Sequence, residues 1–196
     1  MDAGSLRPYG FSHQTFCHIL WDMKETLFLA SPSKQYRDTF LEALQEEVQA
    51  EGDQTSRDIQ RFAADFEGFL QRLSDIERGI NMPHLVPASS FWLIDDGKYI
   101  GSLNLRHELN DHLLHVGGHI GYDIRPSKRR KGYGKEILRL GLEKARERGL
   151  RRVLITCDET NTGSKKIIEA NGGIFENAVT QEGSPVKKLR YWIDIA

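Results

Sequence analysis

A glycine-rich and strongly basic segment is the part of this 196-residue chain whose residue types could do chemistry. It runs from Ile124 to Lys135 and reads IRPSKRRKGYGK. Glycines at the beginning of a helix let the backbone approach a ligand closely and leave N–H groups without intrahelical partners. Those N–H groups, the helix dipole and the surrounding Arg and Lys side chains all favour phosphate. The segment is therefore a candidate phosphate-binding turn.

Two common nucleotide-binding motifs do not fit this segment. A Walker loop has glycine five residues before its Gly-Lys pair and Ser or Thr after it, but Arg129 and Glu136 stand at those positions. A dinucleotide fingerprint needs a third glycine where Ile137 stands. The ligand predicted here is a discrete phosphate-bearing molecule held by another kind of turn.

Charge is distributed unevenly along the chain. The formal net charge is −1, yet twelve basic and four acidic residues between Ile120 and Arg152 give +8, which leaves −9 for the remainder. One basic segment in a nearly neutral chain indicates a site for a discrete anion. Nucleic acid is a weaker alternative, because Tyr133 is the only aromatic residue within the basic cluster that could stack on a base. The acidic remainder predicts a substrate side that prefers cationic amines, with Asp111, Asp123, Asp158 and Glu159 near the expected cleft.

Composition excludes several classes of protein. Hydrophobic residues make up 39% and charged residues 28%, which is typical of a globular domain and not of a disordered chain. No apolar run reaches the length of a membrane span, and residues 1–24 lack the pattern of a secretory signal. Two cysteines, Cys17 and Cys157, provide no disulfide framework. We therefore expect a cytoplasmic location and no membrane partner.

Hydrophobic periodicity predicts an α/β protein of the α+β type, with helices flanking one sheet. Residues 1–24 are expected to be an extension, and residues 25–196 a single domain without internal repeats. The predicted elements are a strand over 26–30, a helix that begins at Ser31-Pro32 and ends near Gly52, a second helix over 59–76, a hairpin over 91–103 around Asp96-Gly97, a strand over 115–124, a helix over 135–148, a strand over 152–157, a helix over 162–170 and a strand over 189–195.

The basic segment resembles the acetyl-CoA loop of the GNAT superfamily of N-acetyltransferases. The family pattern Arg/Gln-x-x-Gly-x-Gly/Ala is met by residues 129–134, and the aliphatic-x-Pro end of the preceding strand is met by Ile124-Arg125-Pro126. The family often continues with a strand and Asn-x-x-Ala/Ser, here Asn161 to Ser164. The resemblance covers about residues 91–195, and within the superfamily the chain is similar to predicted acetyltransferases. It implies a mixed, mostly antiparallel central sheet but names no substrate.

The resemblance also implies which residues hold the cofactor. The backbone of Ile124 would bond to the pantetheine arm, and the amides of residues 129–135 would hold the pyrophosphate. Asn161 would contact the pantetheine or phosphate side, with Ser164 nearby. The implied CoA-binding set is Ile124, Arg125, Pro126, Arg129, Arg130, Lys131, Gly132, Tyr133, Gly134, Lys135, Asn161 and Ser164.

Catalysis would require a proton acceptor for the attacking amine and a donor at the thioester. Asp123, His119 and Glu159 are the candidate bases, because each is expected beside the strand over 115–124. The family often supplies the acid from a tyrosine seven residues after the asparagine, and Ile168 stands at that position here. We therefore expect Ile168 to face the CoA sulfur, so that the usual acid is absent and the thiolate leaves unassisted or with the help of a substitute. The candidate substitutes are Cys157, Tyr122 and Tyr133.

The resulting prediction is an N-acetyltransferase that transfers an acetyl group from acetyl-CoA directly to a primary amine. The acceptor is a small molecule or a protein, and a homodimer is possible. No metal is expected, because the histidines between His107 and His119 lack the compact ligand set of a zinc site. The alternative is a non-catalytic acyl-CoA-binding or regulatory module on the same fold.

Overall fold

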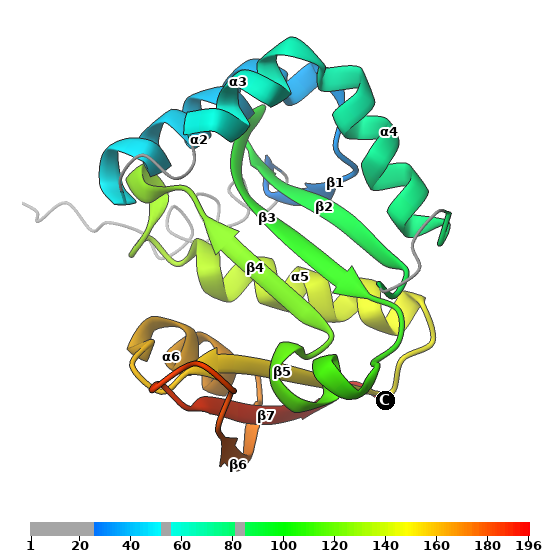
Figure 1. Ribbon diagram of the computed structural model, residues 1–196, viewed down its shortest axis with the longest axis vertical. Coiled ribbons are helices and arrows are strands. Elements are labelled where there is room, and N and C mark those ends of the chain that lie inside the picture. Colours follow the sequence, from blue (N-terminus) through cyan, green and yellow to red (C-terminus); the bar gives the residue numbers. More distant parts are fainter. Residues whose placement is uncertain (1–25, 52–55, 81–84) are drawn as a thin grey trace, which may run out of the picture.

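Two antiparallel sheets lie next to each other, and helices cover the first of them (Figure 1). The computed structural model describes residues 26–51, 56–80 and 85–196. The expected extension over residues 1–24 lies outside these ranges, as does Cys17. The α+β architecture predicted from the sequence is confirmed.

The first sheet has the order β1-β2-β3-β4 and is antiparallel throughout. Its strands are β1 (Phe28–Ala30), β2 (Ala88–Asp95), β3 (Lys98–Arg106) and β4 (Ile120–Ile124). The predicted hairpin joins β2 to β3 at Asp96 and Gly97, which both have positive φ (49° and 70°), as a tight hairpin turn requires. The predicted strand over 115–124 was too long: residues 113–117 form a π-helical turn, and the strand begins only after Gly118, whose φ is +67°.

The second sheet has the order β5-β7-β6, with β5 (Arg152–Asp158), β7 (Lys188–Asp194) and β6 (Ile174–Val179). The periodicity of β7 is confirmed, because Tyr191, Ile193 and the following Ile195 are buried. Strand β6 was not predicted. It lies at the edge of the sheet, and nearly all its side chains are exposed, so it lacks the alternation that marks a half-buried strand.

Three helices pack on one face of the first sheet: α2 (Arg37–Glu51), α3 (Ser56–Ala64) and α4 (Phe66–Glu77). A 3₁₀ turn, Lys34–Tyr36, precedes α2, so the predicted start at Ser31-Pro32 was wrong. The single helix expected over 59–76 is two helices, because Asp65 leaves helical geometry and its side chain accepts a hydrogen bond from Gly68 N (2.8 Å) as the N-cap of α4. Phe40 packs against Phe66 and Trp92 in the cluster beneath these helices.

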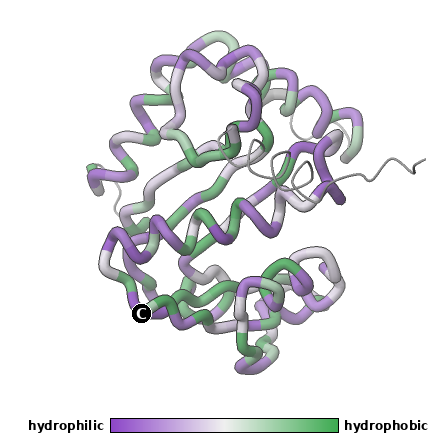
Figure 2. The backbone as a smooth tube through the Cα atoms, turned by 180° about the vertical axis from the view of Figure 1, so that it is seen from behind, coloured by the Kyte–Doolittle hydropathy of each residue, from purple (hydrophilic) through white to green (hydrophobic). Residues whose placement is uncertain are grey.

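The opposite face of the first sheet is covered by α5 (Tyr133–Glu147), which continues the basic segment. Gly141 lets this helix approach the sheet, since a Cβ there would lie 2.3 Å from Leu103 Cδ1. The main core lies between α5, β3, β4 and the second sheet, and Figure 2 shows the hydrophobic segments along these strands. The short helix α6 (Thr162–Ala170) follows β5 and has the bounds predicted for it. No described helix combines the length and the hydropathy that a membrane span requires.

Candidate active site

Strands β4 and β5 meet at one end and separate at the other. At the joined end, His119 N donates to Leu154 O (2.7 Å) and Leu154 N donates to His119 Nδ1 (2.9 Å). Gly118 is required there, because a Cβ would lie 2.6 Å from Leu154 O. Beyond this junction no ladder joins the two described strands. A cavity of about 410 Å³ lies on the side of β4 toward α5 and α6. It is lined by Tyr122, Asp123, Ile124, Arg129, Arg130, Gly134, Asn161, Gly163, Ser164 and Ile167.

The edge of β4 that faces this cavity offers backbone groups to a ligand. Arg106 N donates to His119 O, and Arg125 N donates to Ile100 O, so the backbone groups of His119 and Arg125 face β3. In an antiparallel pair the direction alternates with every residue, so the backbone groups of Tyr122 and Ile124 point to the opposite edge. The Ile124 carbonyl accepts a hydrogen bond from Arg129 Nε (2.8 Å). An extended amide-bearing ligand could pair with this edge as an additional strand.

The glycine turn forms a cradle of backbone donors at the beginning of α5. Arg130 and Gly132 both have positive φ (64° and 90°), an alternation that directs successive N–H groups toward one point. Among the described residues no backbone acceptor is recorded for the N–H groups of residues 130–134, whereas Lys135 N and Glu136 N both donate to Gly132 O. Gly132 caps the helix without a side-chain hydrogen bond. This is the geometry that binds phosphate at a helix N-terminus.

An ion pair from α2 holds the turn in place. Arg125 is 7% exposed, and its guanidinium donates to Glu46 Oε1 (2.5 Å) and to Tyr99 O (3.0 Å). Glu46 also accepts from the backbone N–H and the hydroxyl of Ser127 (3.0 and 2.9 Å). The hydrogen bond from Arg125 is the main cause that lowers the pKa of Glu46 to about 2. Arg125 was predicted to contact CoA, but its guanidinium forms an ion pair with Glu46.

The remaining charges of the basic segment are distributed differently from the sequence expectation. Arg129 pairs with Glu47 of α2 (3.2 Å), so part of the acidic excess neutralises the basic segment and not a substrate side. Asp158, expected at the substrate side, pairs with Lys188 (2.6 Å). Four cations of the segment form no ion pair with any described residue: Lys128, Arg130, Lys131 and Lys135. These four cations are available to an anionic ligand.

Asp123 is the sequence-predicted base that the structure places at the cavity. Its side chain keeps exposed surface and accepts a hydrogen bond from the Ser102 hydroxyl, on the neighbouring residue of β3. Desolvation by the surrounding protein raises the pKa of Asp123, against the opposing effects of Ser102 and Arg129. A carboxylate whose pKa is raised toward neutrality is a stronger base than an ordinary surface aspartate.

The other residues proposed for catalysis lie elsewhere. His119 is 7% exposed, and its Nδ1 accepts the Leu154 N–H, so it joins the two sheets, and burial lowers its pKa. Glu159 accepts from Lys187 N (3.1 Å) in the loop after β5. Tyr133 donates its hydroxyl hydrogen to Asp95 Oδ2 (2.5 Å), and the cavity lining does not include it. These placements argue against a role for the three side chains in proton transfer.

The expectation that Ile168 faces the CoA sulfur was wrong, because this side chain is fully buried in the main core. The residues of α6 that line the cavity are Gly163, Ser164 and Ile167, so Ile167 lies there in place of its neighbour Ile168. The error is one residue, or about 100° around the helix, and the sequence could have revealed it only through the direction in which α6 packs. Glu46 was also missed, because nothing in an amphipathic helix distinguishes one glutamate that meets a buried arginine.

Tyr122 is the candidate donor that does line the cavity. Its hydroxyl oxygen is buried and has no hydrogen bond of normal geometry to a described residue, although the Ser164 hydroxyl lies near it. Burial raises the pKa of Tyr122 to about 12, so the phenol stays protonated at working pH. The other substitute, Cys157, is 6% exposed, and burial raises the pKa of its thiol.

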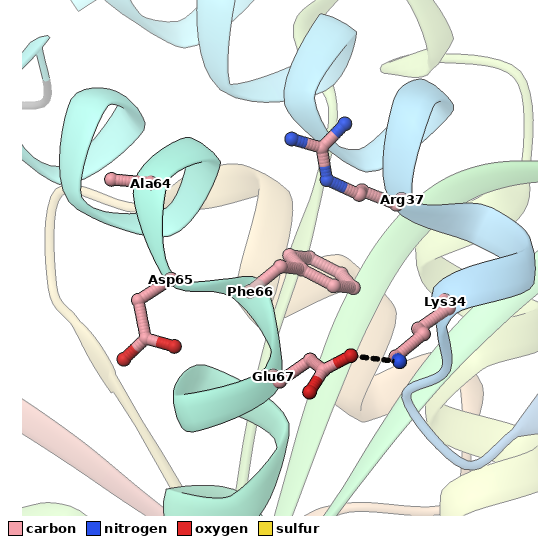
Figure 3. Close-up of a pocket in the computed structure, with 6 residues that line it drawn as sticks. All are labelled: Lys34, Arg37, Ala64, Asp65, Phe66 and Glu67. Atoms are coloured by element: carbon pink, nitrogen blue, oxygen red, sulfur yellow. Dashed lines mark hydrogen bonds and ion pairs between the residues drawn. The ribbon is translucent and has the colours of Figure 1, made fainter.

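A second hollow, of about 400 Å³, lies at the surface between α2, α3 and α4 (Figure 3). Its charged side chains already have partners: Lys34 pairs with Glu67, and Arg37 donates to Ala63 O. Asp65 caps α4. This hollow therefore offers no unsatisfied group to a ligand. Among the described residues, no three His, Cys, Asp or Glu side chains cluster closely enough to hold a metal ion.

Comparison with solved structures gives the same fold. RimJ of Mycobacterium smegmatis, in complex with CoA-disulfide, matches 86% of this chain and 81% of its own with a TM-score of 0.65 and 16% identity. The acetyltransferase of Salmonella typhimurium that modifies the N-terminal serine of ribosomal protein L7/L12 matches 87% of this chain and 96% of its own, with a TM-score of 0.61 and 14% identity. The microcin C7 self-immunity acetyltransferase MccE, in complex with acetyl-CoA and AMP, matches 87% of this chain and 93% of its own, with a TM-score of 0.61 and 14% identity.

A search of curated protein sequences gave no significant match. The family model described as the acetyltransferase (GNAT) domain matches residues 27–174, which is most of the chain. Of the residues that the motif implies for CoA binding, six line the cavity: Ile124, Arg129, Arg130, Gly134, Asn161 and Ser164. The chain therefore belongs to the GNAT family and is an acetyltransferase that uses acetyl-CoA.

Proposed function

We propose that this enzyme transfers the acetyl group directly to a primary amine, with Asp123 as the general base. The observation that carries the proposal is that the Ile124 edge and the cradle of N–H donors border one cavity, and that Asp123 lies at its rim, with its carboxylate held by Ser102 on the adjoining face of the sheet. These groups correspond to the three needs of the reaction: an anchored thioester, a bound pyrophosphate and a proton acceptor.

In the proposed complex the pyrophosphate lies on the N–H groups of residues 130–134, and the pantetheine arm runs along the outer edge of β4. The amine nitrogen forms a bond to the thioester carbonyl carbon while its proton passes to the Asp123 carboxylate. The carbon–sulfur bond then breaks, and the thiolate leaves beside Tyr122. The Tyr122 hydroxyl has no acceptor of normal geometry among the described residues and could donate to the departing sulfur.

The non-catalytic alternative rested on Ile168 in place of the family tyrosine. The family tyrosine is absent at Ile168, but Tyr122 lines the cavity and could supply the donor, which supports the catalytic interpretation over the alternative. We further propose that residues 25–196 form a single domain in the cytoplasm. One candidate acceptor is the amino terminus of a protein, because an acetyltransferase of similar structure modifies the N-terminal serine of a ribosomal protein.

The test measures thiol release from acetyl-CoA with a panel of amines, in the wild type and in Asp123→Asn. Asn keeps the size of the side chain but cannot accept the proton, so kcat should fall by about 10²-fold while CoA affinity stays unchanged. In the wild type the rate should rise with pH through the raised pKa of Asp123, because only the ionised carboxylate is a base.

The matched control is Asp158→Asn, which removes a carboxylate that pairs with Lys188 outside the cavity. It should leave kcat within about twofold of wild type. No acetylation of any amine while CoA binds would support the non-catalytic module. Equal loss in the two variants would show that Asp123 is not the base.

A further inference from the structure

Arg106 is a half-buried cation that has no counter-ion among the described residues. It is the last residue of β3 and is half-buried, and no described Asp or Glu lies within ion-pair distance. Desolvation lowers its pKa, and no neighbouring carboxylate opposes the shift. Arg125, which is buried more deeply than Arg106, is paired with Glu46. A partly desolvated guanidinium with no carboxylate partner gains from an external anion, so Arg106 is a candidate anion-binding group.

The guanidinium of Arg106 is held in position by the turn before β4. Its Nη1 donates to the carbonyl oxygens of Gly117 (3.1 Å) and Gly118 (3.0 Å). No acceptor among the described residues is recorded for Nη2 or Nε. The side chain is therefore oriented by two backbone acceptors while part of its donor edge stays available, which is the arrangement of a preorganised anion-binding group.

A cavity of about 420 Å³ lies against this side chain. Its polar lining comes from Asn104, Arg106, Asn110 and His112, and the lining includes no carboxylate. The volume lies within the range of small-molecule sites. An anionic group in this cavity would meet donors and one positive charge without like-charge repulsion.

The cavity lies on the face of the sheet that carries the proposed base. Ser102 and Asp123 are cross-strand partners, and Arg106 follows Ser102 by four residues, so all three side chains share that face. Between Asp123 and the guanidinium, β4 has only Gly121, at which a Cβ would meet nothing but Arg106 Nη2 at 4.0 Å. Asp123 lies two residues, or about 7 Å, along the strand from Gly121. An acceptor could therefore reach both groups.

We propose that Arg106 binds an anionic group of the acceptor, so that the substrate is an amine that also carries a carboxylate or a phosphate. This inference rests on the proposed function, because it places the amine at Asp123. The two groups on the acceptor are separated by a chain of several bonds, which matches an ω-amino acid or an aminoalkyl phosphate better than an α-amino acid.

The experiment compares matched acceptors by thiol release from acetyl-CoA. The pairs are 5-aminopentanoate with pentylamine, and 3-aminopropyl phosphate with 3-aminopropanol. Wild type should show a kcat/KM at least about tenfold higher for the anionic member of one pair. The pair with the larger ratio identifies carboxylate or phosphate as the group.

Substitution of Arg106 separates recognition from a structural role. Arg106→Gln should lower the anionic-to-neutral ratio to about one, and Arg106→Lys should retain part of it because the charge remains. Arg152→Gln is the control, because Arg152 pairs with Asp194 in the other sheet, and it should leave the ratio unchanged. Loss of the Gly117 and Gly118 contacts alone would lower kcat/KM for both members equally and leave the ratio intact.

The outcomes distinguish this inference from the proposed function. A wild type that acetylates both members of each pair equally overturns the inference and leaves the acetyltransferase assignment standing. A ratio that survives Arg106→Gln also overturns it. A wild type that binds CoA but acetylates no amine in the wider panel overturns the proposed function and this inference with it.

Discussion

The two sides of β4 present different kinds of chemical group. Toward α5 and α6, the cavity is bordered by backbone: the edge of β4 at Ile124, which pairs with no described strand, and the N–H groups of residues 130–134. On the opposite face, the polar groups are the side chains of Asp123, Asn104 and Arg106, contributed by two strands. A constant cofactor needs only a backbone shape, whereas selection among amines needs side chains, which can change without changing the fold.

The largest expected effect is a loss of CoA affinity when the cavity that backbone groups border is blocked. Gly134 lines the cavity as the second residue of α5, and a Cβ there would lie 2.5 Å from Ile167 Cδ1. Gly134→Glu should weaken CoA binding by about 10²-fold or more, because a bulky anion would displace and repel the pyrophosphate. Calorimetry with CoA measures the effect. A glutamate in the first turn is favourable to a helix, so the variant should still fold.

Gly134→Ala is the graded control for that change. Its methyl group meets only the flexible end of Ile167, so CoA affinity should fall less than about tenfold. Affinity that is unchanged in Gly134→Glu would show that the pyrophosphate does not lie at this turn.

A smaller effect, on the free energy of unfolding, tests the ion pair that holds the glycine turn in place. The side chains of Arg125 and Glu46 are 8% and 26% exposed, so Glu46→Gln leaves a buried cation without its partner. The free energy of unfolding should fall by about 2–4 kcal/mol at pH 7, as measured by urea denaturation. The pKa of the Glu46 carboxyl is lowered from 4.5 to about 2, so its contribution is present above pH 4.5 and is lost as pH falls toward 2. The difference between the two proteins should shrink over that range.

Glu42→Gln supplies the comparison within the same helix. Glu42 lies 3.8 Å from the same guanidinium, but its side chain is 63% exposed, so the loss should stay below about 1 kcal/mol. Equal losses in the two variants would show that the interaction is a diffuse charge effect and not a specific pair.

The sequence predicted the backbone side well and the side-chain side poorly, for a physical reason. Local conformational preferences, which depend on the types of neighbouring residues, determine the glycine turn, the hairpin at Asp96-Gly97 and the bounds of α6. Asp123 was one of three equal candidates, because its distinction comes from Ser102 on another strand. The pairing of Glu46 with Arg125 and the isolation of Arg106 depend on register and on helix packing, which no local pattern encodes.

Ile168 illustrates the limit of transferring a motif by position. The family position of the acid was counted correctly along the chain, but the side chain at that position packs into the core and the adjacent Ile167 lines the cavity. A helix of nine residues in which two isoleucines are adjacent leaves its rotation undetermined until the sheet beneath it is known.

The smallest expected effect concerns Tyr122, a residue of β4 that lines the cofactor cavity by its side chain. Its hydroxyl is buried and lacks a hydrogen bond of normal geometry, so Tyr122→Phe should leave the free energy of unfolding unchanged or raise it by up to about 1 kcal/mol. If the hydroxyl donates to the departing sulfur, kcat should fall about tenfold with CoA affinity intact. Because the pKa of Tyr122 is raised to about 12, the loss should be the same across neutral pH.

Tyr133→Phe is the matched control and should show the opposite pattern. It removes a hydroxyl that donates to Asp95, so stability should fall by about 1 kcal/mol while kcat stays unchanged. Comparison of the two variants therefore shows whether the Tyr122 hydroxyl acts in the reaction while the Tyr133 hydroxyl stabilises the fold. A loss of stability in Tyr122→Phe with unchanged kcat would assign that hydroxyl to the fold as well, and thiolate departure would then proceed without a donor from this strand.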